Sequence, residues 1–166
     1  MRFAFLTLWA LTLWALALLA PAKAGETVSG PVTASVVNVI DGDSFVADAL
    51  VWPGMRFRFT IRIKGIDTPE TRRSGCKVEK EAGLAATRRA ETLLRSGKIT
   101  LLSVEADKYY GRVLARVMID GTGDLSEIMI AERYAVPYHG GKRIDWCDGG
   151  AVAARVIDRM TVGATK

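Results

Sequence analysis

The pattern of hydrophobic and polar residues predicts three consecutive β-strands in the first half of the chain. A valine-rich stretch over 34–40 reaches the tight-turn pair Asp41-Gly42, and the pattern resumes over 44–51, which predicts a hairpin. Trp52-Pro53-Gly54 then interrupts it. Strict alternation follows over 55–64, with arginine, threonine and lysine on one face of the strand. We expect the other face to lie in the core, and it carries Met55, Phe57, Phe59, Ile61 and Ile63.

The second half combines helices with two further strands. Residues 77–96 repeat with the helical period and are followed by Gly97, a residue typical of helix ends. The expected buried stripe of this helix is Val78, Ala82, Ala86, Ala90 and Leu93. Strand patterns return over 99–105 and 113–119, and Asp120-Gly121 turns out of the second. Two shorter amphipathic segments, 125–133 and 151–160, predict helices at the end of the chain.

This order of elements predicts an α+β fold. A length of 166 residues, without repeats or linkers, limits the chain to one ordinary domain. Five twisted strands are best accommodated by a small closed barrel flanked by three helices, because closure removes exposed strand edges.

The apolar N-terminal segment is expected to lie outside this domain. Residues 3–20 contain only Thr7 and Thr12 as polar residues, follow Arg2 and precede Ala22-Lys23-Ala24, a pattern typical of a secretory signal peptide. We therefore expect a signal peptide over 1–24, a folded domain over 25–166, and a periplasmic or secreted protein without stable membrane association after cleavage. An uncleaved anchor helix is the alternative, because 18 apolar residues can just span a bilayer.

Charge and cysteine content narrow the chemistry. The chain has 23 Lys and Arg against 18 Asp and Glu, and loss of residues 1–24 would leave a net charge of +3, which permits a polyanionic partner without requiring one. Two cysteines and one histidine exclude a four-thiolate zinc site and sites built on paired histidines. In an exported protein, Cys76 and Cys147 most simply form a disulfide, with two buried free thiols as the alternative.

Two acidic motifs predict a cation site. Taken alone, Asp41-Gly42-Asp43 is compatible with a solvated hairpin turn, and Asp67-Thr68-Pro69-Glu70 with a helix start capped by Thr68. Asp43 opens the second predicted strand and Asp67 follows the third, so pairing of these strands would bring both carboxylates to one rim of the barrel. With oxygen ligands and few protein donors, calcium is preferred over magnesium.

Two arginines near these motifs suggest a phosphate site. Arg62 lies five residues before Asp67, and Arg112 begins the fifth strand. Guanidinium groups match the paired oxygens of a phosphate, although ordinary surface ion pairs are the alternative. Glu70 would then be free to deprotonate a water.

Together, Val39-Ile40-Asp41-Gly42-Asp43-Ser44, Arg62 with Asp67-Thr68-Pro69-Glu70-Thr71, and Tyr110-Gly111-Arg112 resemble the staphylococcal nuclease (thermonuclease) family. The resemblance extends over about residues 33–138. It implies an oligonucleotide-binding (OB) fold barrel with three helices, and a calcium-dependent phosphodiesterase that acts on DNA and RNA and leaves 3′-phosphates. It also implies roles for individual residues: calcium ligation by Asp43, Asp67 and the Thr68 carbonyl, water activation by Glu70, and phosphate binding by Arg62 and Arg112.

The resemblance suggests further substrate contacts as well. The family's Asp-Lys-Tyr-Gly-Arg run occurs here with one additional tyrosine, which shifts Lys108 and Tyr109 relative to the family's product-phosphate contacts. Lys108, Tyr109 and Tyr110 are candidate substrate contacts. Tyr138 is a candidate for stacking on a base, with an ordinary half-buried aromatic as the alternative. Cys76 and Cys147 suit the exported, disulfide-bearing branch of the family. Relatives often place a helix-ending glycine where this chain has Arg133.

The sequence also shares features with two other classes of protein. Gly42-Asp43-Ser44-Phe45 is similar to the motif of Gly-Asp-Ser-Leu esterases. These esterases need an Asp three residues before the catalytic His, but the residue three positions before His139 is Val136. A non-catalytic OB-fold module that binds nucleic acid or protein is the stronger alternative. For the nuclease we expect a monomer with little sequence specificity and a preference for single-stranded DNA or RNA.

Overall fold

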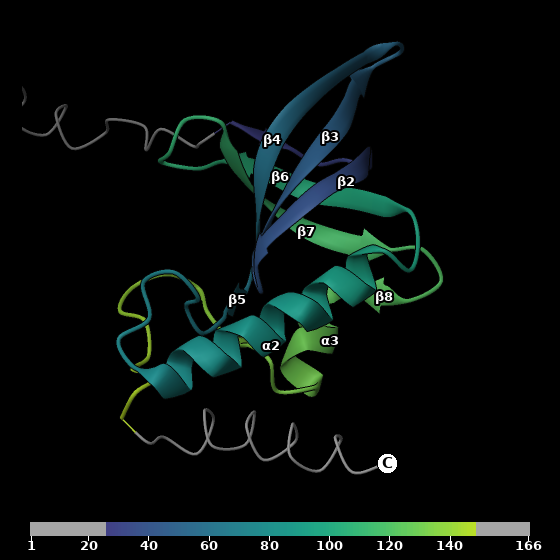
Figure 1. The fold of residues 1–166 in the computed structure, drawn as a ribbon. Coiled ribbons are helices and arrows are strands. Elements are labelled where there is room, and N and C mark those ends of the chain that lie inside the picture. Colours follow the sequence, from purple (N-terminus) through teal and green to yellow (C-terminus); the bar gives the residue numbers. More distant parts are fainter. Residues whose placement is uncertain (1–25, 149–166) are drawn as a thin grey trace, which may run out of the picture.

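The computed structural model describes residues 26–148, and these form a closed five-stranded β-barrel (Figure 1). β2 pairs antiparallel with β3 and with β6, β3 pairs antiparallel with β4, and β6 pairs antiparallel with β7. The parallel pairing of β4 with β7 closes the barrel. The predicted barrel is thus confirmed, while the predicted signal peptide (1–24) and the predicted helix over 151–160 lie outside the described residues. The barrel strands are β2 (Val32–Asp41), β3 (Ser44–Trp52), β4 (Met55–Ile63), β6 (Ile99–Ala106) and β7 (Arg112–Ile119).

Within residues 26–148, four two-residue strands complete the sheets. β1 (Thr27–Val28) extends the barrel sheet beside β6, and β8 (Gly123–Asp124) extends it beside β7. β5 (Ile66–Asp67), directly after β4, pairs with β9 (Val136–Pro137) in a separate small sheet. This second sheet brings the C-terminal part of the described chain beside the Asp67 motif.

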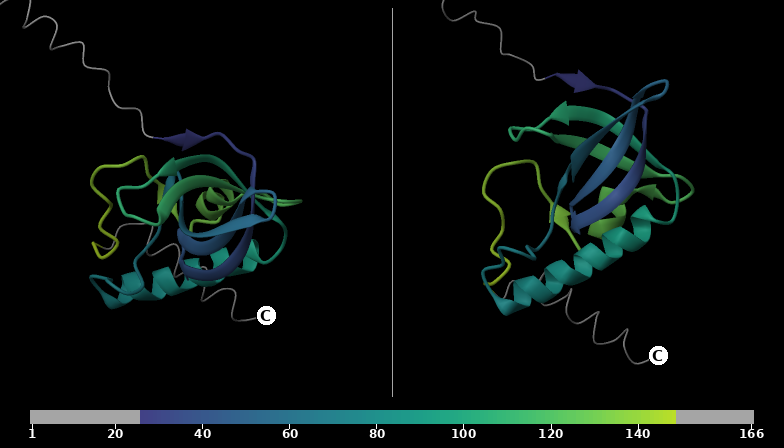
Figure 2. Two further views of the ribbon diagram at one scale, coloured as in Figure 1. Left: turned by 90° about the horizontal axis from the view of Figure 1, so that it is seen from above. Right: turned by 45° about the horizontal axis from the view of Figure 1, so that its top comes forward.

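Two helices are present in residues 26–148, α2 (Lys77–Leu94) and α3 (Leu125–Ala131). α2 runs across one end of the barrel with α3 beside it (Figure 2). Both end two residues earlier than predicted, at caps formed by Arg95 and Glu132. Within the described part of the chain, neither helix has the length and apolar character needed to cross a bilayer.

The core fills the barrel and its contact with α2. Its largest members include Phe45, Ile61, Leu101 and Val117 from the strands and Met129 from α3, all with less than 2% of their surface exposed. Ala86 and Ala90 of α2 pack against these strands, because small side chains let the helix backbone approach the barrel closely.

The predicted core face of 55–64 is wrong at its beginning. Met55 and Phe57 are each 50% exposed, whereas Ile61 and Ile63 are buried. The β3–β4 hairpin extends past the rest of the barrel (Figure 1), so no other element of the described residues covers its tip. Alternation therefore identified the correct face of the strand, but only the half of β4 inside the barrel is covered.

The predicted stripe of α2 is also wrong in its first turn. Val78 is 42% exposed, and the buried residue of that turn is Glu79. The Glu79 carboxylate accepts hydrogen bonds from the N–H groups of Glu70 (3.2 Å) and Gly75 (2.6 Å). On the inner face of this turn, Glu79 therefore binds the loop that precedes α2, and no apolar side chain of the turn enters the core.

Candidate active site

The candidate site lies at one rim of the barrel, where several chain segments meet. The register of β3 and β4 places Ser44 opposite Arg62, so the turn that follows β2 lies beside the end of β4. The parallel pairing of β4 with β7 sets Arg112 opposite Thr60, two residues from Arg62 on the same strand. Strand pairing therefore brings the Asp43, Asp67 and Arg112 motifs to the same rim.

Asp43, Asp67 and Thr68 form a buried cluster of oxygen atoms, with 1%, 0% and 2% of their surface exposed. The Thr68 N–H donates to Asp43 Oδ2 (3.2 Å), and the Ser44 hydroxyl donates to Asp43 Oδ1 (2.9 Å). Residues 68–70 are not helical, and Cys76 is the residue that caps α2. The alternative in which Thr68 starts a helix is thereby overturned.

The buried carboxylates are neutralised from one side by Arg62. Its guanidinium forms an ion pair with Asp43 and lies 3.3 Å from Asp67 Oδ1. Burial raises the pKa of Asp43 to about 6, and the opposing effect of Arg62 limits this rise. Two carboxylates without contact to water need positive charge nearby at neutral pH, and an oxygen-binding cation would supply it as well as a guanidinium does.

A second guanidinium, that of Arg143, reaches the same cluster, and the sequence analysis did not identify it. Its Nε lies 2.6 Å from Asp67 Oδ1, its Nη2 donates to the Thr68 carbonyl (3.0 Å), and its Nη1 is ion-paired with Glu70. Burial alone would lower the pKa of Arg143. The hydrogen bond to Glu70 and the negative charge of Asp67 outweigh this effect, so the pKa lies above its ordinary value. In the sequence, only the predicted disulfide indicated that Arg143 could lie near Asp67, because this bond brings the segment before Cys147 close to Cys76.

Glu70 is positioned by the loop that rests on α2. Besides its hydrogen bond to Glu79, the backbone of this loop lies directly against Gly83 of the helix. A Cβ at Gly83 would lie 2.7 Å from the Pro69 carbonyl oxygen and 2.8 Å from that of Glu70, so this close approach requires glycine. The Glu70 side chain keeps about a third of its surface exposed, toward the cleft.

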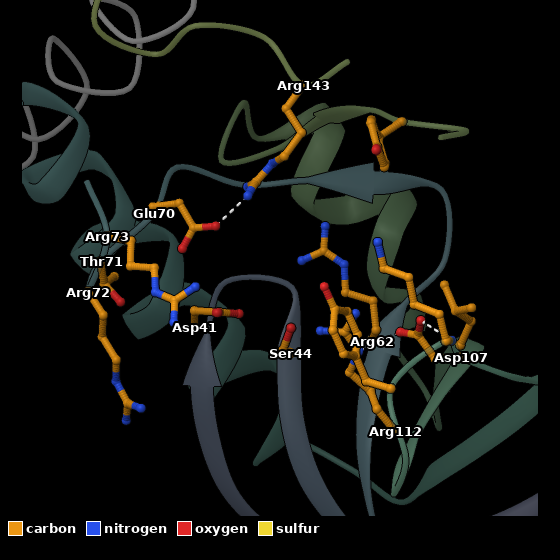
Figure 3. A pocket seen from close by; sticks show the side chains of 14 residues that line it. Asp41, Ser44, Arg62, Glu70, Thr71, Arg72, Arg73, Asp107, Arg112 and Arg143 are labelled. Carbon is orange, nitrogen blue, oxygen red and sulfur yellow. Dashed lines mark hydrogen bonds and ion pairs between the residues drawn. The ribbon is translucent and has the colours of Figure 1, made fainter. Parts of the chain in front are cut away.

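A cleft of about 670 Å³ (Figure 3) adjoins the buried cluster, because Arg62 and Arg143 both line the cleft and contact Asp67. Among the described residues, its charged lining is mainly basic, with Arg62, Arg72, Arg73, Lys108, Arg112 and Arg143 against Asp41, Glu70 and Asp107. Arg72 and Arg73 were not predicted as site residues. A cleft with this surplus of positive charge favours a polyanionic substrate.

The predicted substrate contacts divide into two groups. Lys108, Tyr109 and Tyr138 line the cleft, and the Tyr109 ring lies 4.4 Å from the Arg112 guanidinium and 5.1 Å from Lys108 Nζ. The Tyr138 hydroxyl donates to the Gly141 carbonyl (2.8 Å). Tyr110, by contrast, is fully exposed and is not part of the cleft lining. Of the two adjacent tyrosines in this run, only Tyr109 therefore lies at the cleft.

The predicted disulfide between Cys76 and Cys147 is confirmed, with a Cα–Cα distance of 5.9 Å. Beside it, the Trp146 side chain is buried and its indole N–H donates to Asp67 Oδ2 (3.4 Å). Glu79 lies near both sulfur atoms, but bonded sulfurs cannot act as thiolate ligands for a metal. The donors that do fit a hard cation are the carboxylates of Asp43 and Asp67 and the Thr68 carbonyl.

Comparison with protein-family models matches residues 60–145 to the family described as staphylococcal nuclease homologue. The matched part runs from the end of β4 to the segment that carries Arg143, and Asp43 lies before it. No curated protein matches the chain.

Proposed function

The chain belongs to the family of staphylococcal nuclease homologues, and from this premise we propose that it is a calcium-dependent nuclease that hydrolyses phosphodiester bonds of DNA and RNA and leaves 3′-phosphates. One observation carries the proposal: Glu70, Arg62 and Arg112 line one basic cleft, and Arg62 also contacts a buried pair of aspartates. Ion pairs at scattered surface positions would not require this convergence.

Asp43, Asp67 and the Thr68 carbonyl are the residues that would hold the calcium ion. Once bound, the ion supplies positive charge to a phosphate oxygen and to the attacking water. Carboxylate and carbonyl oxygens suit calcium, and so small a set of protein ligands is expected to bind it weakly, with a Kd of roughly 0.1–1 mM.

Arg62, Arg112 and Glu70 would act on the diester itself. The two guanidiniums line the same cleft and can donate to the non-bridging oxygens, whose negative charge increases as water attacks. Glu70 accepts the proton of that water. The bond between phosphorus and O5′ then breaks, and O5′ takes up a proton from solvent, so that the products are a 3′-phosphate and a 5′-hydroxyl.

The substrate is proposed to be single-stranded, bound without sequence specificity by a monomer. Tyr138 and Tyr109 offer aromatic faces within the cleft, and a base can stack on such a face only when it is unpaired. The described part of the chain presents no helix that projects from the surface to enter a major groove, because α2 and α3 both pack against the barrel.

We also propose that the protein acts outside the cytoplasm, in the periplasm or after secretion. The disulfide supports this location, since such bonds persist mainly in oxidising compartments. The predicted signal peptide would direct export, and a chain of 25–166 would be the mature domain.

The nuclease proposal is tested by digestion of single-stranded DNA with the oxidised 25–166 protein. We expect acid-soluble fragments with 3′-phosphate ends in calcium, none in chelator, and a strong loss of activity in Glu70→Gln. Heat-denatured DNA should be cut faster than duplex DNA. A protein that shifts the mobility of DNA in calcium but never shortens it would instead be the non-catalytic binding module.

A further inference from the structure

Arg143 binds two of the three groups that the proposed function assigns to calcium. Its guanidinium contacts the Asp67 carboxylate (2.6 Å), the Thr68 carbonyl (3.0 Å) and the Glu70 carboxylate. Figure 3 shows its side chain reaching across the cleft to Glu70. Two of these three partners are proposed metal ligands, and the third is the proposed base.

Two guanidiniums connect the buried cluster with the cleft. Asp43, Asp67 and Thr68 are at most 2% exposed and do not line the cleft, whereas Arg62 and Arg143 line it and also contact Asp67. Arg62 belongs to a fully paired segment of β4 and is fixed by the barrel. Arg143 belongs to a segment without helix or strand structure, so it is the guanidinium that can move aside.

This segment is held at both ends, which keeps Arg143 close to the cluster. At one end β9 pairs with β5, and the Tyr138 N–H donates to the Gly65 carbonyl (2.9 Å). At the other end Trp146 is buried against Asp67, and Cys147 is bonded to Cys76. A cation tethered in this way is present at an effective concentration in the millimolar range or above, comparable to that of a weakly bound ion.

We propose that Arg143 is a tethered competitor of the divalent ion and sets the calcium affinity of the site. A guanidinium and a divalent ion repel each other, so they cannot both bind the Asp67 and Thr68 oxygens at the same time. Calcium binding must therefore displace Arg143, and the same displacement frees Glu70 from its ion pair. This inference rests on the proposed function, since it takes Asp67 and Thr68 as calcium ligands.

The test is a calorimetric titration of the full mature protein with calcium alone. Arg143→Gln is expected to bind calcium at least about tenfold more tightly than the wild type, because a positive charge in contact with the site is removed. Arg143→Lys keeps the charge but cannot make three contacts at once, so its affinity should lie between the two. Arg95→Gln removes an exposed, ion-paired arginine at the end of α2 and should leave the affinity unchanged.

The direction of the effect separates competition from a structural role, because loss of a merely structural contact would weaken calcium binding. Equal or weaker binding by Arg143→Gln would overturn the inference, as would an equal gain in Arg95→Gln. If Arg143→Gln is too unstable to titrate, Arg143→Lys is compared with the wild type instead. Calcium binding by Arg143→Lys that is no tighter than that of the wild type would then contradict competition. A wild-type protein that binds no calcium and cuts no DNA would overturn the proposed function itself.

Discussion

Arg112 illustrates how a single side chain is prepared for phosphate binding. Its guanidinium is ion-paired with Asp107 and lies over the Tyr109 ring at 4.4 Å. Burial acts to raise the pKa of Asp107, but hydrogen bonds from Arg112 and from the Lys108 N–H hold it below its ordinary value. Asp107 is therefore charged at neutral pH, and it orients Arg112 before any substrate arrives.

Replacing Arg112 tests the phosphate clamp. Arg112→Ala is expected to lower turnover of single-stranded DNA by roughly 10³- to 10⁵-fold, the range found for charge-stabilising arginines in phosphoryl transfer. The matched control is Arg58→Ala, which removes an exposed arginine of β4 paired with Asp48 and should retain activity. Initial rates and thermal unfolding are measured together. An Arg112→Ala protein that is folded and keeps more than about a tenth of the activity would contradict the assignment.

Arg133 occupies a backbone conformation that disfavours its own side chain. Its φ is +64°, and the N–H groups of Arg133 and Tyr134 donate to the carbonyls of Ile130 and Met129, both at 2.9 Å, which closes the end of α3. This pattern is the one that normally carries a left-handed glycine after a helix. A glycine would adopt this conformation without strain, so the exposed Arg133 occupies the position at a cost in free energy.

Arg133→Gly is expected to stabilise the protein by about 1 kcal/mol. The strain of a left-handed non-glycine residue is roughly 1–2 kcal/mol, and the extra freedom of glycine in the unfolded chain offsets part of the gain. The free energy of unfolding is measured by urea denaturation. Arg133→Ala is the control, because it removes the same exposed side chain without relieving the φ strain, and it should bring no such gain.

The helix α3 shows how a buried charge at an element boundary depends on pH. Asp124 caps its first turn by accepting hydrogen bonds from the Ser126 N–H (2.8 Å) and hydroxyl (2.5 Å), and it is ion-paired with Arg116 at 2.7 Å. Burial acts to raise the pKa of Asp124, but these bonds hold it below its ordinary value. A lowered pKa in the folded state means that the stabilisation is complete above the unfolded pKa of about 3.9 and is lost as the pH falls through the folded value.

Asp124→Asn should therefore have a pH-dependent effect. At pH 7 we expect a loss of about 1–2 kcal/mol, because asparagine can still cap the helix but no longer pairs with Arg116. The difference from the wild type should shrink as the pH falls below about 4, because the aspartate of the unfolded chain is protonated there before that of the folded protein. Urea unfolding over a pH series measures this difference, and a constant value from pH 7 to pH 3 would contradict the explanation.

The disulfide joins two parts of the chain that strand pairing alone leaves separate. Cys76 precedes α2 and Cys147 lies 71 residues later, beyond the β5–β9 pair. The bond thereby holds the segment that carries Arg143 close to the Asp67 motif. Its effect on the unfolded state should be large, because a long loop is closed.

Removal of this bond is expected to reduce the free energy of unfolding. For a loop of this length, Cys76→Ser with Cys147→Ser should cost about 4 kcal/mol relative to the oxidised protein. Urea denaturation of the double variant, of the oxidised wild type and of the reduced wild type gives the comparison, and the last should resemble the double variant. Equal stability of the three proteins would show that the disulfide does not stabilise the fold by restricting the conformations of the unfolded chain.

The amino-acid sequence alone was enough to predict the five barrel strands, both described helices, the cysteine pair and the family. These features depend on local periodicity, on turn residues such as Asp41-Gly42, or on motifs whose members lie a few positions apart. Such signals report which face of an element is apolar, because the side chains of one face recur at fixed spacing.

The contacts of Arg143, the exposure of Phe57 and the burial of Glu79 emerge only in three dimensions. Arg143 meets Thr68 across 75 positions of chain, and no local pattern records such a contact. Phe57 is apolar and on the expected face, yet its burial depends on how far the neighbouring strands extend. Periodicity thus identifies the side that an element can bury, whereas the lengths and positions of its partners determine which residues are covered and which charges meet.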